Sequence, residues 1–222
     1  MVGEELERRA RVHAALGEPA RLAIADRLVP GDASPGELGA ALGLATNLLA
    51  HHLRVLQDAG VIRRVQSEGD RRRTYVQLRL TDPIVRSAVT PQHAPVAGRR
   101  VVFVCTHNSA RSQLAAASWR QFSPVPVACA GTHPAARVHP GAVAAGRRHG
   151  LRLGRARTAH VDQVLRPDDL VVAVCDSAHE ELDPQLPRLH WSIPDPVRVG
   201  TDAAFDAAYT QINDRIRALA EH

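Results

Sequence analysis

One segment constrains the fold of this chain more than any other: the run V-V-F-V-C-T-H-N-S-A-R-S at residues 101–112. Its apolar beginning predicts a short buried strand, and the residues that follow Ser112 favour a helix. In such a strand–loop–helix unit the loop N–H groups converge on one anion, and the helix N-terminus adds its positive end. The spacing Cys-x5-Arg-Ser therefore predicts a cradle for a tetrahedral oxyanion.

The side chains of this loop suit nucleophilic chemistry. The positive field favours the thiolate of Cys105, a candidate nucleophile. Arg111 offers a planar fork to two oxygens of a bound anion. The alternative is a buried cysteine beside an incidental arginine. The candidate oxyanion-binding residues are Thr106, His107, Asn108, Ser109, Ala110, Arg111 and Ser112.

Composition limits the cellular context. The net charge of the 222 residues is only +5, which does not by itself indicate nucleic-acid binding. No apolar run approaches the roughly 18 residues that cross a membrane, and the polar start does not resemble a signal peptide. Three cysteines, an odd number, indicate reduced thiols. We therefore expect a cytoplasmic protein without a membrane segment.

The chain is predicted to contain two domains. Residues 88–100 hold two prolines, a glycine and no hydrophobic period, which is typical of a linker. We place the first domain at residues 1–90, the linker at 91–99 and the second domain at 100–222. All three cysteines fall in the second domain.

The first domain is predicted to be a winged helix-turn-helix. Two helices around a glycine-containing turn are followed by two alternating segments that flank S-E-G-D-R-R-R, a hairpin with a basic tip. Residues 45–79 contain seven arginines and three acidic residues. This excess of positive charge favours binding to DNA. For R-R-R taken alone, the alternative to DNA binding is an ordinary run of charged residues exposed to solvent. The expected helices cover 4–16, 19–28, 36–42 and 45–59, and the expected strands 61–65 and 74–80.

The phrase H-H-L-R-V-L-Q-D-A-G-V-I, followed by G-D-R-R-R-T-Y-V-Q-L, resembles the arsenic-repressor (ArsR/SmtB) family over roughly residues 6–90. The resemblance implies a homodimer that binds a double-stranded DNA operator, with one helix of each subunit in the major groove. The DNA contacts it implies are Thr46, Asn47, His51 and Arg54 on the reading helix and Arg71, Arg72 and Arg73 on the wing.

This part of the chain departs from the family pattern in two ways. Ala50 stands where members often have serine, and the metal-sensing cysteines that often precede the reading helix are absent. His51 and His52 are adjacent and point to different helix faces, which makes them a poor metal pair. We therefore predict no metal site.

The second domain is predicted to have an α/β fold. Strand-like runs alternate with helical stretches, which indicates a parallel sheet covered by helices on both faces, with the ligand at the carboxyl end of the strands. The expected strands are 101–105, 125–130, 170–175 and 189–193, and the expected helices are 112–122, 140–149 and 201–220.

The phrases V-F-V-C-T-H-N-S-A-R-S-Q-L-A, A-G-T-H-P, V-V-A-V-C-D-S-A and W-S-I-P-D-P-V-R-V-G-T resemble the flavodoxin-like low-molecular-weight tyrosine phosphatases, and among them the arsenate reductases, over roughly residues 99–220. The resemblance implies that Cys105 is the nucleophile and Arg111 the oxyanion clamp. It also implies that Asn108 braces the loop, that Ser112 bonds the thiolate and that Asp195 is the acid. A plain turn before Pro196 is the alternative for Asp195.

The flanks favour a reductase over a phosphatase. Val197-Arg198-Val199 follow the Asp-Pro pair, where tyrosine phosphatases carry aromatic residues, and His107 is typical of the reductase branch. The substrate implied is arsenate or a phosphate-like oxyanion.

The cysteine count bears on the electron donor. Cys175 matches the first relay cysteine of thioredoxin-coupled relatives, but Leu182 and Asp183 stand where the second would precede Pro184. Two routes stay open: a low-molecular-weight thiol (mycothiol or glutathione) attacks the Cys105 adduct, or Cys175 resolves it directly and thioredoxin is the donor. Cys129 is interpreted as a small core residue.

The sequence thus predicts an arsenic-responsive transcription regulator fused to an arsenate reductase without a bound cofactor. The alternatives are a transcription factor whose second domain only senses an oxyanion, and a protein tyrosine phosphatase fused to a DNA-binding domain.

Overall fold

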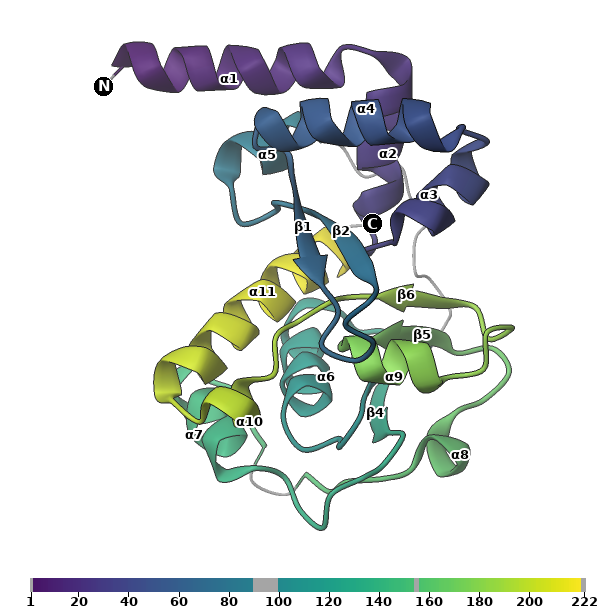
Figure 1. Cartoon of the computed structure of the whole chain (residues 1–222). Helices are drawn as coiled ribbons and strands as arrows, with labels where there is room; N and C mark the ends of the chain where they lie inside the picture. The colour runs from purple at the N-terminus through teal and green to yellow at the C-terminus, as the bar shows by residue number, and fades with distance from the viewer. Residues whose placement is uncertain (1, 90–99, 154–155, 221–222) are drawn as a thin grey trace. The chain divides into compact units, whose positions relative to one another are not determined.

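The computed structural model describes residues 2–89, 100–153 and 156–220 (Figure 1). The chain divides into two compact units, an N-terminal and a C-terminal one, which are described in turn. The predicted linker, residues 91–99, lies outside the described residues.

The N-terminal unit is a winged helix-turn-helix, as predicted. A Ser34–Glu37 capping box and Pro35 begin the first helix of the motif. Gly43, with φ of 64°, ends that helix in the left-handed conformation that glycine adopts without strain. The elements are α1 (Val2–Leu16), α2 (Pro19–Leu28), α3 (Pro35–Leu42), α4 (Thr46–Asp58), β1 (Ile62–Gln66), β2 (Thr74–Leu78) and α5 (Pro83–Ala88).

The wing is an antiparallel pair of strands. Its register runs from Ile62 opposite Leu78 to Gln66 opposite Thr74. Inside the unit, Tyr75 and Val76 are buried, whereas Arg63 and Arg64 on the other strand are exposed. The wing therefore buries residues of one strand while the other offers arginines to solvent.

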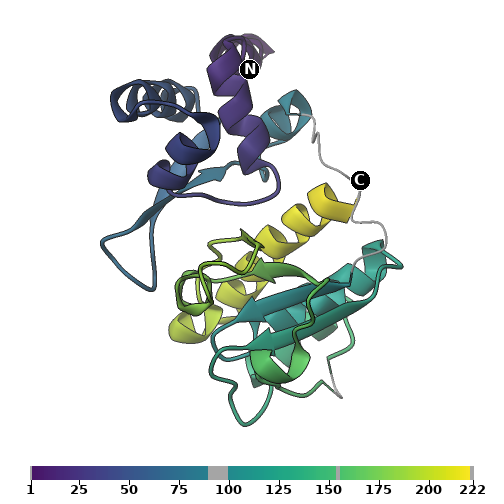
Figure 2. The ribbon, with the colours of Figure 1, turned by 90° about the vertical axis from the view of Figure 1, so that its right-hand side faces the viewer.

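The C-terminal unit is built on a four-stranded parallel sheet with the order β4-β3-β5-β6. Helices α6 and α11 pack together on one face, and α8 and α9 lie on the other (Figures 1 and 2). The strands are β3 (Val101–Cys105), β4 (Val127–Gly131), β5 (Leu170–Ala173) and β6 (Arg188–His190). The helices are α6 (Arg111–Phe122), α7 (Pro140–Arg148), α8 (Val161–Val164), α9 (Asp176–Glu181), α10 (Pro196–Val199) and α11 (Asp202–Ala220).

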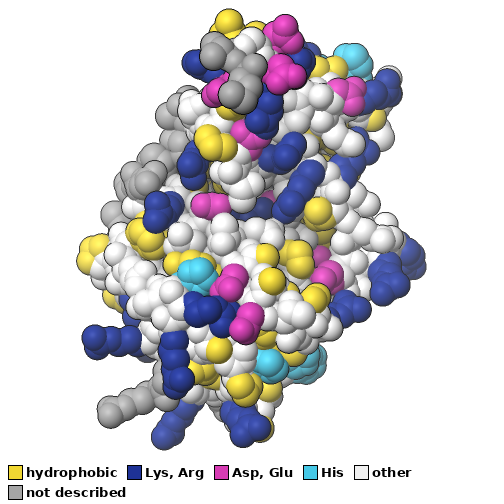
Figure 3. All heavy atoms as spheres, turned by 90° about the vertical axis from the view of Figure 1, so that its left-hand side faces the viewer, with side chains coloured by type: hydrophobic (Ala, Val, Ile, Leu, Met, Phe, Trp, Pro, Cys, Tyr) yellow, Lys and Arg dark blue, Asp and Glu magenta, His cyan; other side chains and the backbone are white. Residues whose placement is uncertain are grey.

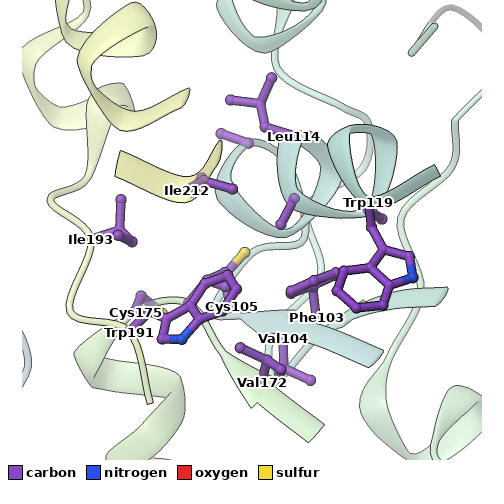
Figure 4. Close-up of a cluster of buried hydrophobic side chains, with 14 of the residues drawn as sticks. Phe103, Val104, Cys105, Leu114, Trp119, Val172, Cys175, Trp191, Ile193 and Ile212 are labelled. Atoms are coloured by element: carbon purple, nitrogen blue, oxygen red, sulfur yellow. The ribbon is translucent and has the colours of Figure 1, made fainter. Parts of the chain in front are cut away.

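Strand β3 occupies the centre of this core. All five of its residues are buried, as expected for a parallel strand with helices on both faces. The ring of Phe103 lies 6.1 Å from that of Trp119 and 5.6 Å from that of Trp191, centroid to centroid (Figure 4). This aromatic cluster fixes the base of the strand from which the Cys105 loop departs.

The strand order brings two cysteines to one end of the sheet. The chain runs from β3 to β4 on one side and returns to β5 on the other, so that the ends of β3 and β5 are adjacent. Open α/β sheets bind ligands at such a reversal. Val104 pairs with Ala173, and Cys105 and Cys175 follow within two residues.

The structure differs from the sequence prediction at short elements. The strand expected to reach Cys175 ends at Ala173, because Cys175 already precedes α9. Helices α5, α8, α9 and α10 were not predicted, since segments of four to six residues carry little periodicity. Among the described helices, none has the length and apolar character needed to cross a bilayer.

Candidate active site and nucleic-acid interface

The carbonyl groups of the loop after β3 accept hydrogen bonds from neighbouring segments. Backbone N–H groups of the chain after β4 donate to the carbonyls of Cys105, Thr106, His107 and Ser109, at 2.8–3.2 Å. The Gln113 amide donates to the Asn108 carbonyl at 3.0 Å. The loop is therefore held in one shape from outside.

The same arrangement leaves the N–H groups of the loop available. Within the described chain, the backbone N–H groups of residues 107–110 donate no hydrogen bond. The start of α6 carries no side-chain cap at Ala110. Uncapped helix N–H groups and a concave run of amides form an anion nest. The loop is thus preorganised for a tetrahedral oxyanion.

A chain of hydrogen bonds links the backbone of the loop to the candidate nucleophile. The Cys105 Sγ lies 3.1 Å from the Ser112 Oγ, which accepts from the Asn108 Nδ2 at 2.8 Å. Asn108 has φ of 48°, in the left-handed region that few residues other than glycine adopt, in keeping with its implied role of bracing the loop. The Asn108 Oδ1 accepts from the Ala159 N–H at 3.0 Å. These bonds hold the Cys105 side chain at the mouth of the nest.

Gly131, at the end of β4, is required by the close approach of this loop. A Cβ added there would lie 2.7 Å from the Thr106 carbonyl oxygen and 2.9 Å from the Asn108 nitrogen. Both contacts are with backbone, so they cannot be relieved by a side-chain movement. The sequence did not by itself indicate a role for Gly131 or Gln113. For Gly131, the glycine in A-G-T-H-P was the signal that could have indicated it.

Arg111 and Asp195 meet at this site. The Arg111 Nη2 lies 3.1 Å from the Asp195 Oδ2, and its Nη1 donates to the Ile193 carbonyl at 2.9 Å. Burial alone would lower the pKa of Arg111, but electrostatic interactions with the neighbouring Cys175, Cys105 and Asp195 side chains raise it. Arg111 therefore stays charged. Asp195 also caps α10, with its Oδ1 accepting from the Val197 N–H at 3.0 Å, so the turn interpretation and the acid role are compatible.

Cys175 lies beside the same loop. Its Sγ is 3.5 Å from the Thr106 Oγ1, and its thiol is buried next to Trp191 (Figure 4). Burial raises the pKa of Cys175, and Arg111 opposes this shift. His107 is exposed at the rim, whereas Ser109 and Ala110 are buried in the loop. The structure thus brings all the predicted residues of this site together.

Of the predicted DNA-contacting residues of α4, Asn47, His51 and Arg54 lie on one face, whereas Thr46 lines a pocket together with Leu49 and Leu53. Leu49, Leu53 and Leu56 are buried on the opposite face. His52 is buried and His51 exposed, in keeping with their different directions. The candidate DNA contacts Thr46, Asn47, His51 and Arg54, and Arg71, Arg72 and Arg73 on the wing, are all exposed.

No cluster of three or more His, Cys, Asp and Glu side chains within the described residues could hold a metal ion.

Comparison with known proteins agrees with this geometry. Residues 100–222 match the family model of low molecular weight phosphotyrosine protein phosphatases, and residues 16–65 match a helix-turn-helix domain model. The first match covers more than half of the chain. The chain therefore belongs to the low molecular weight phosphotyrosine protein phosphatase family, with a helix-turn-helix domain at its N-terminal side.

The relatives matched by the C-terminal unit include arsenate reductases. The chain is 34% identical over 133 residues to the arsenate reductase of Halalkalibacterium halodurans and 32% identical over 132 residues to that of Bacillus subtilis. In each case 54% of this chain and 94% of the relative are covered. The crystal structure of arsenate reductase from Archaeoglobus fulgidus matches with a TM-score of 0.50 and 29% identity, covering 55% of this chain and 99% of that one.

Proposed function

We propose that the C-terminal unit reduces arsenate to arsenite and that the N-terminal unit makes the chain an arsenic-responsive transcription regulator. The observation that carries the first part is the Cys105 loop. The carbonyl groups of this loop accept hydrogen bonds from neighbouring segments, and its N–H groups are available to bind an anion. Cys105, Arg111 and Asp195 surround this anion nest. The similarity to arsenate reductases supports arsenate as the oxyanion.

The first chemical step forms a covalent adduct. The Cys105 thiolate attacks arsenic, and one As–OH oxygen takes a proton from Asp195 and leaves as water. Arg111 and the loop N–H groups bind the remaining oxygens. The product is a Cys105 thioester of arsenate, still at the oxidation state of the substrate.

The second step transfers electrons. A low-molecular-weight thiolate attacks the Cys105 Sγ, the S–As bond breaks, and its electron pair remains on arsenic, which departs as arsenite. Cys105 is left in a mixed disulfide. A second thiol molecule then releases the oxidised donor and regenerates Cys105. We propose mycothiol or glutathione as the donor, since Leu182 and Asp183 occupy the place of a second relay cysteine.

Arsenate fits this site better than an aryl phosphate does. The segment after Asp195 presents Val197, Arg198 and an exposed Val199, with no aromatic ring to stack on a phenyl group. An arsenate anion needs only the nest. A protein tyrosine phosphatase remains the alternative within the same family.

For the N-terminal unit, we propose binding of a homodimer to an inverted-repeat operator. A single short reading helix contacts too few base pairs for useful specificity, and a dimer doubles the site. Arsenite made by the second unit would then relieve repression.

The deciding assay supplies arsenate together with a thiol donor and measures arsenite and thiol loss. We expect arsenite formation, in step with oxidation of two thiols per arsenate. Hydrolysis of an aryl phosphate at a higher kcat/KM than arsenate reduction would instead make the phosphatase the correct function. Binding of arsenate without turnover of either substrate would leave only an oxyanion sensor.

Asp195→Asn should slow arsenate reduction about 100-fold, because the leaving oxygen loses its proton donor. The loop and Arg111 are unchanged, so the Kd for phosphate should stay within a few-fold of the original. Single-turnover formation of the Cys105 adduct separates the two effects. A normal adduct rate in this variant would assign Asp195 to capping α10 alone.

Cys175→Ser should reduce turnover only a few-fold when a low-molecular-weight thiol is the donor, because that thiol attacks Cys105 directly. Mass spectrometry after arsenate treatment should show the small thiol on Cys105. A Cys105–Cys175 disulfide, with thioredoxin sustaining turnover and the Cys175→Ser variant dead, would favour the two-cysteine relay.

A further inference from the structure

The C-terminal unit has a second cleft, separate from the Cys105 nest. It has a volume of about 730 Å³ and is lined by residues of α6, β4 and α7 and by described residues between 151 and 157. Four arginines line it: Arg120, Arg147, Arg152 and Arg157. We call it the arginine cleft. Its size falls within the range of small-molecule sites, about 300–1,000 Å³.

Among the described residues that line the arginine cleft, no acidic side chain balances its positive charge. These four arginines form no ion pair within the described chain. Two other arginines of the unit are paired with acids. Arg148 pairs with Asp202 and Asp206 at 3.2 and 3.0 Å, and Arg100 pairs with Asp169 at 2.6 Å. Figure 3 shows arginines projecting from the lower part of this unit.

We propose that the arginine cleft binds a small polyanion, a molecule that carries two or more phosphate or carboxylate groups. Gathering four like charges in one concave site costs free energy that an anionic ligand recovers. The guanidinium fork pairs with both phosphate and carboxylate oxygens. Four forks spread around one cleft suit several anionic groups better than the single anion of the Cys105 nest.

Cys129 provides a reporter inside the cleft. It lies on the edge strand β4, is only half-buried, and is one of the lining residues. Burial raises the pKa of its thiol, and Arg120 opposes the shift. Cys105 and Cys175 are buried elsewhere. A polyanion in the cleft would therefore shield Cys129 from alkylation.

The cleft is connected to the nest through two side chains, because the Cys129 thiol interacts with the Asn108 side chain and Gln113 bonds the same loop. Gln113 lines the cleft, and its Nε2 donates to the Arg157 carbonyl at 2.9 Å and to the Asn108 carbonyl at 3.0 Å. A test must therefore separate direct shielding of Cys129 from an effect of anion binding at the Cys105 loop.

The experiment follows alkylation of Cys129 by N-ethylmaleimide in the full chain, with peptide mass spectrometry to locate the label. Pyrophosphate at about ten times its Kd should slow labelling about tenfold, since only the empty fraction reacts. Citrate tests carboxylates in the same way. Protection by pyrophosphate, by citrate or by both supports the site and identifies the groups it accepts; protection by neither overturns it.

Arg147→Gln combined with Arg152→Gln localises the effect. Both side chains are exposed and make no ion pair within the described chain, so the fold should be retained. Protection should be lost in this double variant and kept in the matched variant Arg166→Gln with Arg217→Gln, which removes the same charge elsewhere on the unit. Equal protection in both variants would place the ligand at the Cys105 loop and overturn the proposal.

Discussion

Replacing Cys105 by serine should reduce arsenate turnover by more than about 1,000-fold, because a serine hydroxyl neither forms the thioester nor carries a disulfide. The change is nearly isosteric, and the Ser112 Oγ at 3.1 Å can bond the new hydroxyl. The loop N–H groups should therefore still bind phosphate. Arsenite production in the presence of excess thiol is the measurement.

Two controls accompany the Cys105→Ser variant. Its affinity for operator DNA should be unchanged, because Cys105 belongs to the C-terminal unit and the proposed DNA contacts to the N-terminal one. Its Kd for phosphate, measured by calorimetry, should change no more than a few-fold. Residual arsenite formation within tenfold of the unmodified chain would show that another thiol is the nucleophile.

Replacing Arg71, Arg72 and Arg73 together by alanine should weaken binding to every DNA sequence. If each arginine contacts one phosphate, the loss of three contacts lowers the salt slope by about 2.7 and the affinity in 0.1 M salt about 500-fold. A dimer with two wings would lose up to twice as many contacts. Binding to operator and unrelated DNA across a salt series provides the measurement.

The matched control for the wing removes three exposed arginines of the C-terminal unit, Arg137, Arg166 and Arg217. It causes the same change in net charge, so it separates contact from long-range attraction. We expect a much smaller effect on the salt slope. An unchanged slope in the wing variant would mean that the hairpin tip does not touch DNA.

Elements with a strong local signal were predictable. Strand β3 and helix α6 agree with the sequence to within one residue, because β3 is a short apolar run and α6 follows the loop with residues that favour a helix. Helix α5 was missed although Asp82-Pro83 is a good helix start, since its six residues were too few to outweigh the nearby prolines. Packing decides elements of this length.

The residues of the candidate active site were predictable from the sequence, but the contacts between them were not. The spacing of Cys105 and Arg111 identified the loop, and the resemblance added Asp195. The 3.1 Å contact of Asp195 with Arg111 depends on how the chain after β6 returns to the sheet. Cys129 was interpreted as a core residue because its neighbours are apolar, and it does pack, partly buried, against the core. Its place on the edge strand β4, beside the arginine cleft, follows from the strand order, which no local pattern contains.

The hydrogen bonds that fix the carbonyl groups of the Cys105 loop have a consequence for substrate choice. A nest held rigid from outside recognises tetrahedral shape and negative charge, which phosphate, sulfate and arsenate share. Such a loop has little means of telling arsenate from phosphate by affinity. Discrimination between arsenate and phosphate then depends on the redox step. A thiol can reduce arsenic(V) to arsenic(III), whereas it cannot reduce phosphorus(V). Phosphate would occupy the nest as a competitor but would not be consumed, so the ratio of arsenate to phosphate would determine the rate of arsenate reduction.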